Sequence, residues 1–207
     1  KTPFLSSVFT ITSHEPYVIP KAYAGKFEKG HIPMHQCVGY TDHALRQFFK
    51  KSSKASWFEN TIFLFTADHS NQTYYPFYEK TVNRFANPLM IFKHNSKLKG
   101  IDMRLASHMD ILPTVADLID YPKPFKSWGR SLLSNRDHNP FLINYFSGGS
   151  YFIMDENLIC VHNGNYAIGF YDLQDKNMEN NLIQNKTQQM IELEKKCSMF
   201  LEDYFET

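Results

Sequence analysis

Two Asp-His pairs and a loop histidine are the residues of this chain whose types and spacing suit catalysis or metal binding. Asp68-His69 directly follows the apolar, β-branched and aromatic run at 61–66, which is typical of a buried strand. Ligands of open α/β sheets bind outside the carboxyl ends of the strands, and a carboxylate oxygen beside an imidazole nitrogen suits Zn or Mn. The pair therefore predicts a metal site. The alternative is that Asp68 caps the next segment while His69 lies on the surface.

The position of each remaining histidine in the chain indicates whether a functional or a structural role is expected. His14 follows the apolar run at 4–11, a second strand exit, so its loop and the Asp68 loop are expected to face one crevice. A structural role for His14 is the alternative. Asp42-His43 lies in a helical pattern, where adjacent side chains point about 100° apart, and this favours a structural role. Three more histidines lack a partner at ligand spacing and are expected to be structural, namely His108, His138 and His162.

Alternating strand and helix signals over the first two thirds of the chain predict an α/β fold with a mostly parallel sheet flanked by helices. Strand patterns occupy 4–11, 61–66 and 88–92, and helical patterns occupy 37–50 and 110–119. Asp110 is the N-cap candidate of the second helix. The run at 61–66 is apolar throughout, so it is expected to be buried on both faces in the parallel sheet.

The pattern changes past residue 138. Short strands are predicted at 141–146, 157–161 and 166–170, and a closing amphipathic helix at 187–204. Asn163-Gly164 suits a type I′ hairpin turn between the last two strands. The chain is thus expected to have two parts. The first is the α/β part over residues 1–137, and the second, packed on it, is a small antiparallel sheet with a terminal helix over residues 138–207.

Composition excludes several classes of protein. The 207 residues carry 22 Lys and Arg against 21 Asp and Glu, a formal charge of +1, which does not fit a nucleic-acid binder. The three cysteines lie far apart and suggest neither a zinc knuckle nor a disulfide scaffold. No apolar run approaches the roughly 18 residues of a membrane span. The abrupt start at Lys1 leads us to expect a piece of a longer protein.

Five short motifs follow one another along the chain. They are Pro3-Phe4-Leu5 with Ser13-His14-Glu15-Pro16-Tyr17, Tyr40-Thr41-Asp42 with Phe48-Phe49, Asn60-Thr61-Ile62-Phe63 with Thr66-Ala67-Asp68-His69, Asn87-Pro88-Leu89-Met90-Ile91, and Ser107-His108-Met109-Asp110-Ile111-Leu112-Pro113-Thr114 with Gly129-Arg130-Ser131-Leu132-Leu133. In this order they resemble the carboxy-terminal half of the sulfatase-like phosphotransferases of the alkaline phosphatase superfamily. The resemblance is greatest to the lipoteichoic-acid-synthase-like phosphoglycerol transferases, and it covers about residues 1–135.

The resemblance implies roles for three residues. Asp68 and His69 would bind the catalytic divalent metal, Mn or Zn with Mg or Ca as alternatives, and His14 would hold the substrate's phosphate or its departing glycerol. In that family a threonine of the amino-terminal half attacks phosphorus, and an acidic residue of that half completes the metal site. Neither lies in this chain, so no catalytic nucleophile is assigned here and the 207 residues alone are expected to be inactive. Ser70 stands where many members of the superfamily have glycine.

Two functions from different classes follow from the resemblance. The first is the carboxy-terminal part of a metal-dependent phosphoglycerol transferase or of a phosphodiester or sulfate ester hydrolase. Its partners would be a phospholipid head group, a phosphoglycerol polymer or a sulfated or phosphorylated glycan. It would act at the extracytoplasmic side of a bacterial cell membrane, held by an amino-terminal anchor outside this chain. The alternative is a non-catalytic remnant that binds an anionic glycan or phospholipid head group.

Overall fold

The computed structural model describes residues 3–97, 99–134 and 140–206. The chain divides into two compact units, Lys1–Lys99 and Gly100–Thr207. Each unit contains its own sheet, with two strands in the first and four in the second. The boundary expected between residues 137 and 138, like His138, lies outside the described residues.

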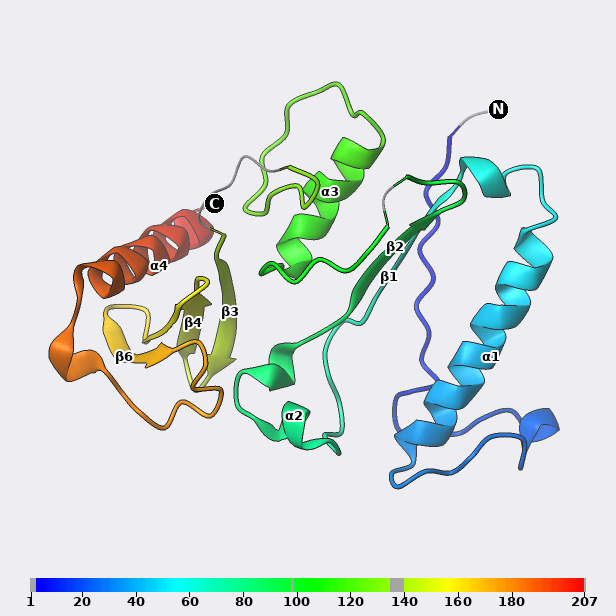
Figure 1. Cartoon of the computed structure of the whole chain (residues 1–207), viewed down its shortest axis with the longest axis horizontal. Helices are drawn as coiled ribbons and strands as arrows, with labels where there is room; N and C mark the ends of the chain where they lie inside the picture. Colours follow the sequence, from blue (N-terminus) through cyan, green and yellow to red (C-terminus); the bar gives the residue numbers. More distant parts are fainter. Residues whose placement is uncertain (1–2, 98, 135–139, 207) are drawn as a thin grey trace. The chain divides into compact units, whose positions relative to one another are not determined.

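A long helix and a two-stranded sheet form the centre of the first unit (Figure 1). The helix is α1 (Met34–Ser52), and the strands are β1 (Ile62–Thr66) and β2 (Leu89–Lys93). Phe49 of α1 lies with its ring centroid 5.2 Å from Phe63 of β1 and 5.6 Å from Phe92 of β2. Aromatic side chains therefore hold the helix against the sheet. The shorter elements of this unit are η1 (Lys21–Tyr23), η2 (Phe58–Asn60), α2 (Pro76–Glu79) and η3 (Asn83–Phe85).

The direction of the strands differs from the expected one. β1 and β2 run antiparallel, with Ile62 opposite Lys93 and Thr66 opposite Leu89. Every strand pair in the described part of the chain is antiparallel, so the mostly parallel sheet is not seen there. Parallel neighbours are usually joined by a long crossover helix, whereas β1 and β2 are joined through α2 and η3, which have 4 and 3 residues. β1 is half-buried rather than enclosed on both faces.

The segment expected to form the first strand has no strand in the structure. Residues 3–11 carry no regular secondary structure, and their apolar side chains point into solvent. Phe4 is 72% exposed, Leu5 92% and Val8 81%. Alternating apolar residues predict a strand only when a neighbouring strand supplies hydrogen bonds and a covered face. Within the described residues this segment has no such neighbour.

The second unit contains the predicted small antiparallel sheet and closing helix. Its elements are η4 (His108–Asp110), α3 (Ile111–Leu118), β3 (Leu142–Ser147), β4 (Ser150–Met154), β5 (Leu158–His162), β6 (Ala167–Asp172), η5 (Ile183–Asn185) and α4 (Gln188–Glu206). The strands lie in the order β3-β4-β5-β6. β4 was not predicted from the sequence. It begins directly after Gly148 and Gly149, whose φ angles of 55° and 81° allow the turn from β3.

The turn between β5 and β6 is not the predicted type I′ turn. Gly164 has a φ of 95°, but Asn163 does not adopt a positive φ. The side chain of Asn163 instead accepts hydrogen bonds from the backbone N–H groups of Asn165 and Tyr166. The Asn163 side chain thus satisfies the backbone N–H groups of the loop, so the turn does not need a second residue with a positive φ.

The main hydrophobic core lies between α4 and the four-stranded sheet. α4 contributes Met190, Leu193, Cys197 and Leu201, which are buried against sheet residues. The sheet side of this core is formed by Ile143, Ile153, Leu158, Cys160, Ala167 and Phe170. The spacing of these four helix residues by three and four places them on one face of an amphipathic helix.

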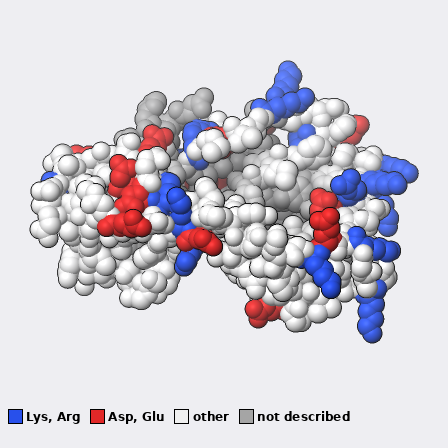
Figure 2. Space-filling view, turned by 60° about the horizontal axis from the view of Figure 1, so that its bottom comes forward, with Lys and Arg blue, Asp and Glu red and all other residues white. Residues whose placement is uncertain are grey.

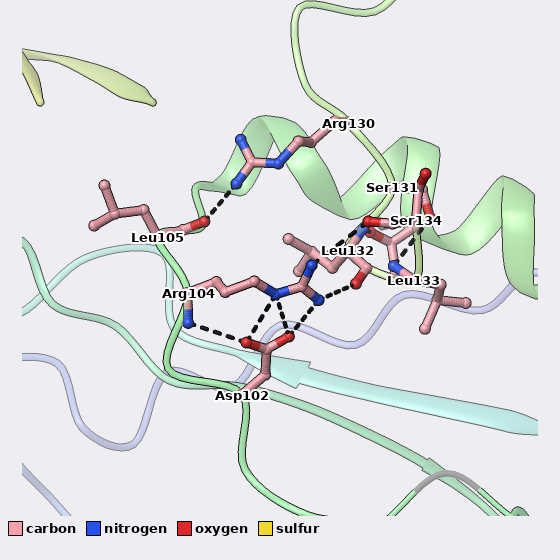
Figure 3. A network of polar contacts seen from close by, with 9 residues as sticks. Asp102, Arg104, Leu105, Arg130, Ser131, Leu132, Leu133 and Ser134 are labelled. Atoms are coloured by element: carbon pink, nitrogen blue, oxygen red, sulfur yellow. Dashed lines mark hydrogen bonds and ion pairs between the residues drawn. The ribbon is translucent and has the colours of Figure 1, made fainter. Parts of the chain in front are cut away.

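Polar contacts hold the segment before η4 to the loop after α3 (Figure 3). Arg104 donates to both carboxylate oxygens of Asp102 and, at 2.7 Å, to the backbone carbonyl of Leu132. These hydrogen bonds lower the pKa of Asp102 to about 2. Arg130 donates to the carbonyl of Leu105 at 2.7 Å.

Asp110, the N-cap candidate, serves the residues before and after its helix rather than the helix N-terminus. Its carboxylate accepts from the backbone N–H of Ser107 at 2.8 Å and of Arg130 at 2.9 Å. The Ser107 side chain in turn accepts from Met109, which completes a capping box at η4.

Candidate metal centre

Asp68 and His69 lie where β1 ends and the chain enters a loop. The side chain of Asp68 is 54% exposed and that of His69 is 67% exposed, so both are accessible from solvent. The backbone N–H of His69 donates to Asp68 Oδ1 at 2.9 Å, which fixes the carboxylate beside the imidazole. The strand end thus presents two adjacent side chains of the predicted ligand types.

The imidazole of His69 is oriented by the backbone. Its Nδ1 lies 2.7 Å from the carbonyl oxygen of Ser70. A carbonyl oxygen can only accept, so Nδ1 carries a proton and donates it, and the neutral ring keeps its lone pair on Nε2. Metal-binding histidines commonly donate their second ring nitrogen to a carbonyl or carboxylate in this way.

The two free ligand atoms lie close together. His69 Nε2 is 3.4 Å from Asp68 Oδ2. Two ligand atoms that are each about 2.1 Å from a tetrahedral ion lie about 3.4 Å apart. Without a proton on Nε2 or a cation between the two atoms, a lone pair and a carboxylate oxygen would face each other. The donor types and their separation therefore fit a divalent transition metal.

His14 lies in a turn that leaves one of its ring nitrogens free. Its Nδ1 is 3.0 Å from the carbonyl oxygen of Glu15, so the same reasoning places the proton on Nδ1. The backbone carbonyl of His14 accepts from the N–H of Tyr17 at 2.9 Å, which closes the turn. Nε2 of this exposed side chain is available to a substrate atom.

One hydrogen bond links the His14 turn to the loop after β1, while the shared crevice stays a prediction. The hydroxyl of Tyr17 donates to Oδ1 of Asn71 at 3.4 Å. Ser70 donates its hydroxyl to the carbonyl of Arg84. Its side chain is therefore directed to the backbone of η3.

Two ligands do not complete a metal site. Within the residues that the structure describes, no three His, Cys, Asp or Glu side chains gather closely enough to hold an ion. A Zn or Mn ion fills four or more positions, so further ligands would come from water, substrate or residues outside this chain. That an acidic residue elsewhere in the whole protein completes the site stays a prediction.

Three of the side chains predicted to be structural make packing or hydrogen-bond contacts within the described chain, namely Asp42, His43 and His162. Asp42 accepts from Arg46 one helical turn away, and the His43 ring packs 5.4 Å from Tyr23. His162 is fully buried, accepting from the N–H of Gly164 with Nδ1 and lying 3.2 Å from Ser198 Oγ through Nε2. None of these three acidic or imidazole side chains lies in the loops of the candidate site.

One cluster near the candidate centre was not singled out from the sequence. The His31 ring stacks on Tyr74 at 4.8 Å, and His35 lies edge-on to Tyr74 at 5.2 Å and stacks on Tyr75 at 6.1 Å. The spacing of the two histidines by four residues was the available signal, but His31 lies before the start of α1, so a helical spacing rule does not apply to the pair. Which aromatic residues they meet is not encoded in that spacing.

The fold is similar to that of a solved structure from the alkaline phosphatase superfamily. A solved structure of a protein of this superfamily from Vibrio parahaemolyticus superposes with a TM-score of 0.70 and 23% sequence identity, covering 96% of this chain and 48% of the other. The sulfatase family model matches residues 1–121, and the chain belongs to the sulfatase family.

Curated relatives point in the same direction. Lipoteichoic acid synthase 1 of Bacillus subtilis (strain 168) is 28% identical over 158 residues, which is 67% of this chain and 24% of the relative. Lipoteichoic acid synthase of Staphylococcus aureus (strain USA300) is 24% identical over 156 residues, with the same coverage of 67% and 24%. The chain thus spans about a quarter of the length of these relatives.

Two further observations concern surface and membrane. Over the face shown in Figure 2, the described residues form no continuous basic surface, in keeping with the balanced charge of the sequence. Among the helices that the structure describes, none combines the length and hydropathy needed to cross a bilayer.

Proposed function

We propose that this chain is the carboxy-terminal part of a metal-dependent sulfatase-like enzyme that transfers or hydrolyses a phosphoglycerol, phosphodiester or sulfate ester group. The observation that carries the proposal is the 3.4 Å separation of His69 Nε2 and Asp68 Oδ2 at the end of β1, with the imidazole held by the Ser70 carbonyl. Family membership and the lipoteichoic acid synthase relatives support the reaction class.

The chain's own residues would divide the work. Asp68 and His69 would hold a Mn or Zn ion, which when bound supplies a Lewis acid that lowers the pKa of an attacking hydroxyl and screens charge on the ester oxygens. With a second proton on Nε2, His14 would orient the ester and give a hydrogen bond or that proton to the leaving oxygen. The nucleophile and the remaining ligand would come from an amino-terminal half of the whole protein.

The proposed substrates follow from this chemistry. A phospholipid head group, a phosphoglycerol polymer, or a phosphorylated or sulfated glycan each carries the anionic ester that such a site would bind. We place the reaction at the extracytoplasmic side of a bacterial cell membrane, with an amino-terminal membrane anchor in the whole protein.

The test is His69→Ala in the whole protein, which we expect to lower turnover at least about 100-fold, because it removes a ligand whose role no neighbour can take. His43→Ala is the matched control, since His43 of α1 packs on Tyr23 of η1, and it should leave turnover near normal. Near-normal turnover of His69→Ala would overturn the assignment.

Metal binding is tested separately by thermal unfolding with and without Mn or Zn. We expect the metal to raise the melting temperature of the wild-type protein and to have little effect on Asp68→Ala. If Asp68 is purely structural, Asp68→Ala should instead lower the free energy of unfolding by about 0.5–1 kcal/mol whether metal is present or absent. Metal binding without turnover of any anionic ester would favour a non-catalytic binding protein.

A further inference from the structure

The loop that follows the candidate metal pair is fixed to other parts of the first unit at both of its ends. Near its start, the Ser70 hydroxyl donates to the carbonyl of Arg84. Near its far end, the Tyr74 ring lies flat on His31, with ring centroids 4.8 Å apart and planes inclined by 10°. Asn71 lies between these two anchors, so its backbone has little freedom to follow a distant partner.

The contact of Tyr74 with His31 is supported by a second histidine, His35. The N–H of His31 donates to Nδ1 of His35 at 3.1 Å, and the His35 ring contacts both tyrosines of the loop. A Cβ at Gly30, whose φ is 62°, would lie 2.4 Å from that same Nδ1. The chain before α1 is therefore shaped to bring the two histidine rings against the loop.

Tyr17 belongs to the same turn as His14. Its φ of 57° is unusual for a residue with a side chain, and its N–H donates to the carbonyl of His14. The ring of Tyr17 is half-buried, and its hydroxyl lies 3.4 Å from Oδ1 of Asn71, a residue 54 positions later in the sequence. His14 and the metal pair are thus joined through one side-chain hydrogen bond.

We infer that Tyr17 and Asn71 are a positioning pair that sets the place of His14 relative to Asp68 and His69. The inference rests on the proposed function, in which His14 and the metal pair must act on the same phosphate or sulfate ester. Without the hydrogen bond, the exposed His14 turn and the loop after β1 would move independently. A reacting group must be held close to its attack geometry, so such movement lowers kcat more than it raises KM.

The test is a double-mutant cycle in the whole, metal-loaded protein. Tyr17→Phe removes only the donor, and Asn71→Ala removes only the acceptor. We expect each to lower kcat about fivefold, as the loss of one neutral hydrogen bond does, and the double variant to lose no more than either single variant. Tyr78→Phe, which removes an exposed tyrosine hydroxyl from α2, is the control and should leave kcat unchanged. Additive losses, or no loss, would overturn the inference.

Amide hydrogen exchange provides a readout that does not depend on activity. Tyr17→Phe should speed exchange in residues 68–75, and Asn71→Ala should speed exchange in residues 12–18, because each loop restrains the other. Exchange changes confined to the mutated loop would overturn the pairing. The two variants could show these reciprocal changes in exchange while the wild-type protein turns over no anionic ester. That result would overturn the proposed function but support the link between the loops.

Discussion

His69 shows how the backbone orients the side chain of a proposed metal ligand. The Ser70 carbonyl favours the proton on Nδ1, so Nε2 could accept a cation without a tautomer change. The residue is largely exposed, which leaves access for an ion and an anionic substrate together. A histidine that had to rotate or exchange its proton first would bind the same metal more weakly.

His162 is the opposite case, a histidine whose surroundings keep it neutral. Burial lowers its pKa, and Nδ1 accepts from Gly164 N–H, so that atom has no room for a proton. The unfolded chain therefore binds a proton more readily than the folded one. The contribution of neutral His162 to the stability of the folded chain is fully present above the ordinary histidine pKa of about 6.5. This contribution is lost as the pH falls below that value.

We accordingly expect the melting temperature of the wild-type chain to fall between pH 7.5 and pH 5 by more than that of His162→Gln. The variant lacks the titrating group, so it should be less stable at pH 7.5 but should change less with pH. Thermal unfolding in buffers of matched ionic strength measures both. Equal pH dependence in the two proteins would show that His162 does not carry the effect.

At the scale of elements, Gly129 determines how closely the loop after α3 approaches η4. A Cβ at this position would lie 2.0 Å from the carbonyl oxygen of Met109 and 2.7 Å from the backbone nitrogen of Asp110. Backbone atoms cannot rotate away as a side chain can. The hydrogen bond from Arg130 N–H to Asp110 depends on this approach.

Gly129→Ala should therefore destabilise the second unit by about 2–3 kcal/mol, because the loop must shift away from η4. Lys123→Ala, an exposed change in the same loop, is the control and should stay within about 0.5 kcal/mol of the wild type. Urea unfolding followed by Trp128 fluorescence in a Trp57→Phe background measures both. An unchanged urea midpoint for Gly129→Ala would contradict the close approach.

The elements also show what the sequence can and cannot predict. Periodicity located α1, β1, β2, α3 and α4 to within a few residues, and the apolar run of β1 correctly placed Asp68-His69 at a strand end. The direction of β2 was missed because a run of apolar residues is the same for parallel and antiparallel neighbours. The hydrogen bond from Tyr17 to Asn71 was beyond reach, since side-chain partners 54 residues apart leave no local pattern.

For the whole molecule, burial is unequal between the two units. All ten members of the main core cluster, from Ile143 to Leu201, belong to the second unit. In the first unit, the segment at 3–11 leaves Phe4, Leu5 and Val8 largely exposed. An exposed apolar segment of this kind, lacking a strand partner in the described chain, favours association between molecules.

We expect the isolated 207-residue chain to aggregate through this segment, and Val8→Lys to reduce the aggregation severalfold, because a charge on the segment opposes edge-to-edge pairing. Ile101→Lys is the matched control, since Ile101 is 90% exposed but lies outside the segment. Light scattering during incubation at one protein concentration compares the three. Equal suppression by both lysines would show that net charge, not the segment, controls aggregation.

The three cysteines described above have a practical consequence for spectroscopy. Cys37, Cys160 and Cys197 are each fully buried, and burial raises the pKa of every one of these thiols, that of Cys197 to about 12. The thiolate is the nucleophile that attacks maleimide and methanethiosulfonate reagents, so all three cysteines should remain unlabelled in the folded chain. A spin label or fluorophore can therefore be attached at a newly introduced surface cysteine without first removing the native ones.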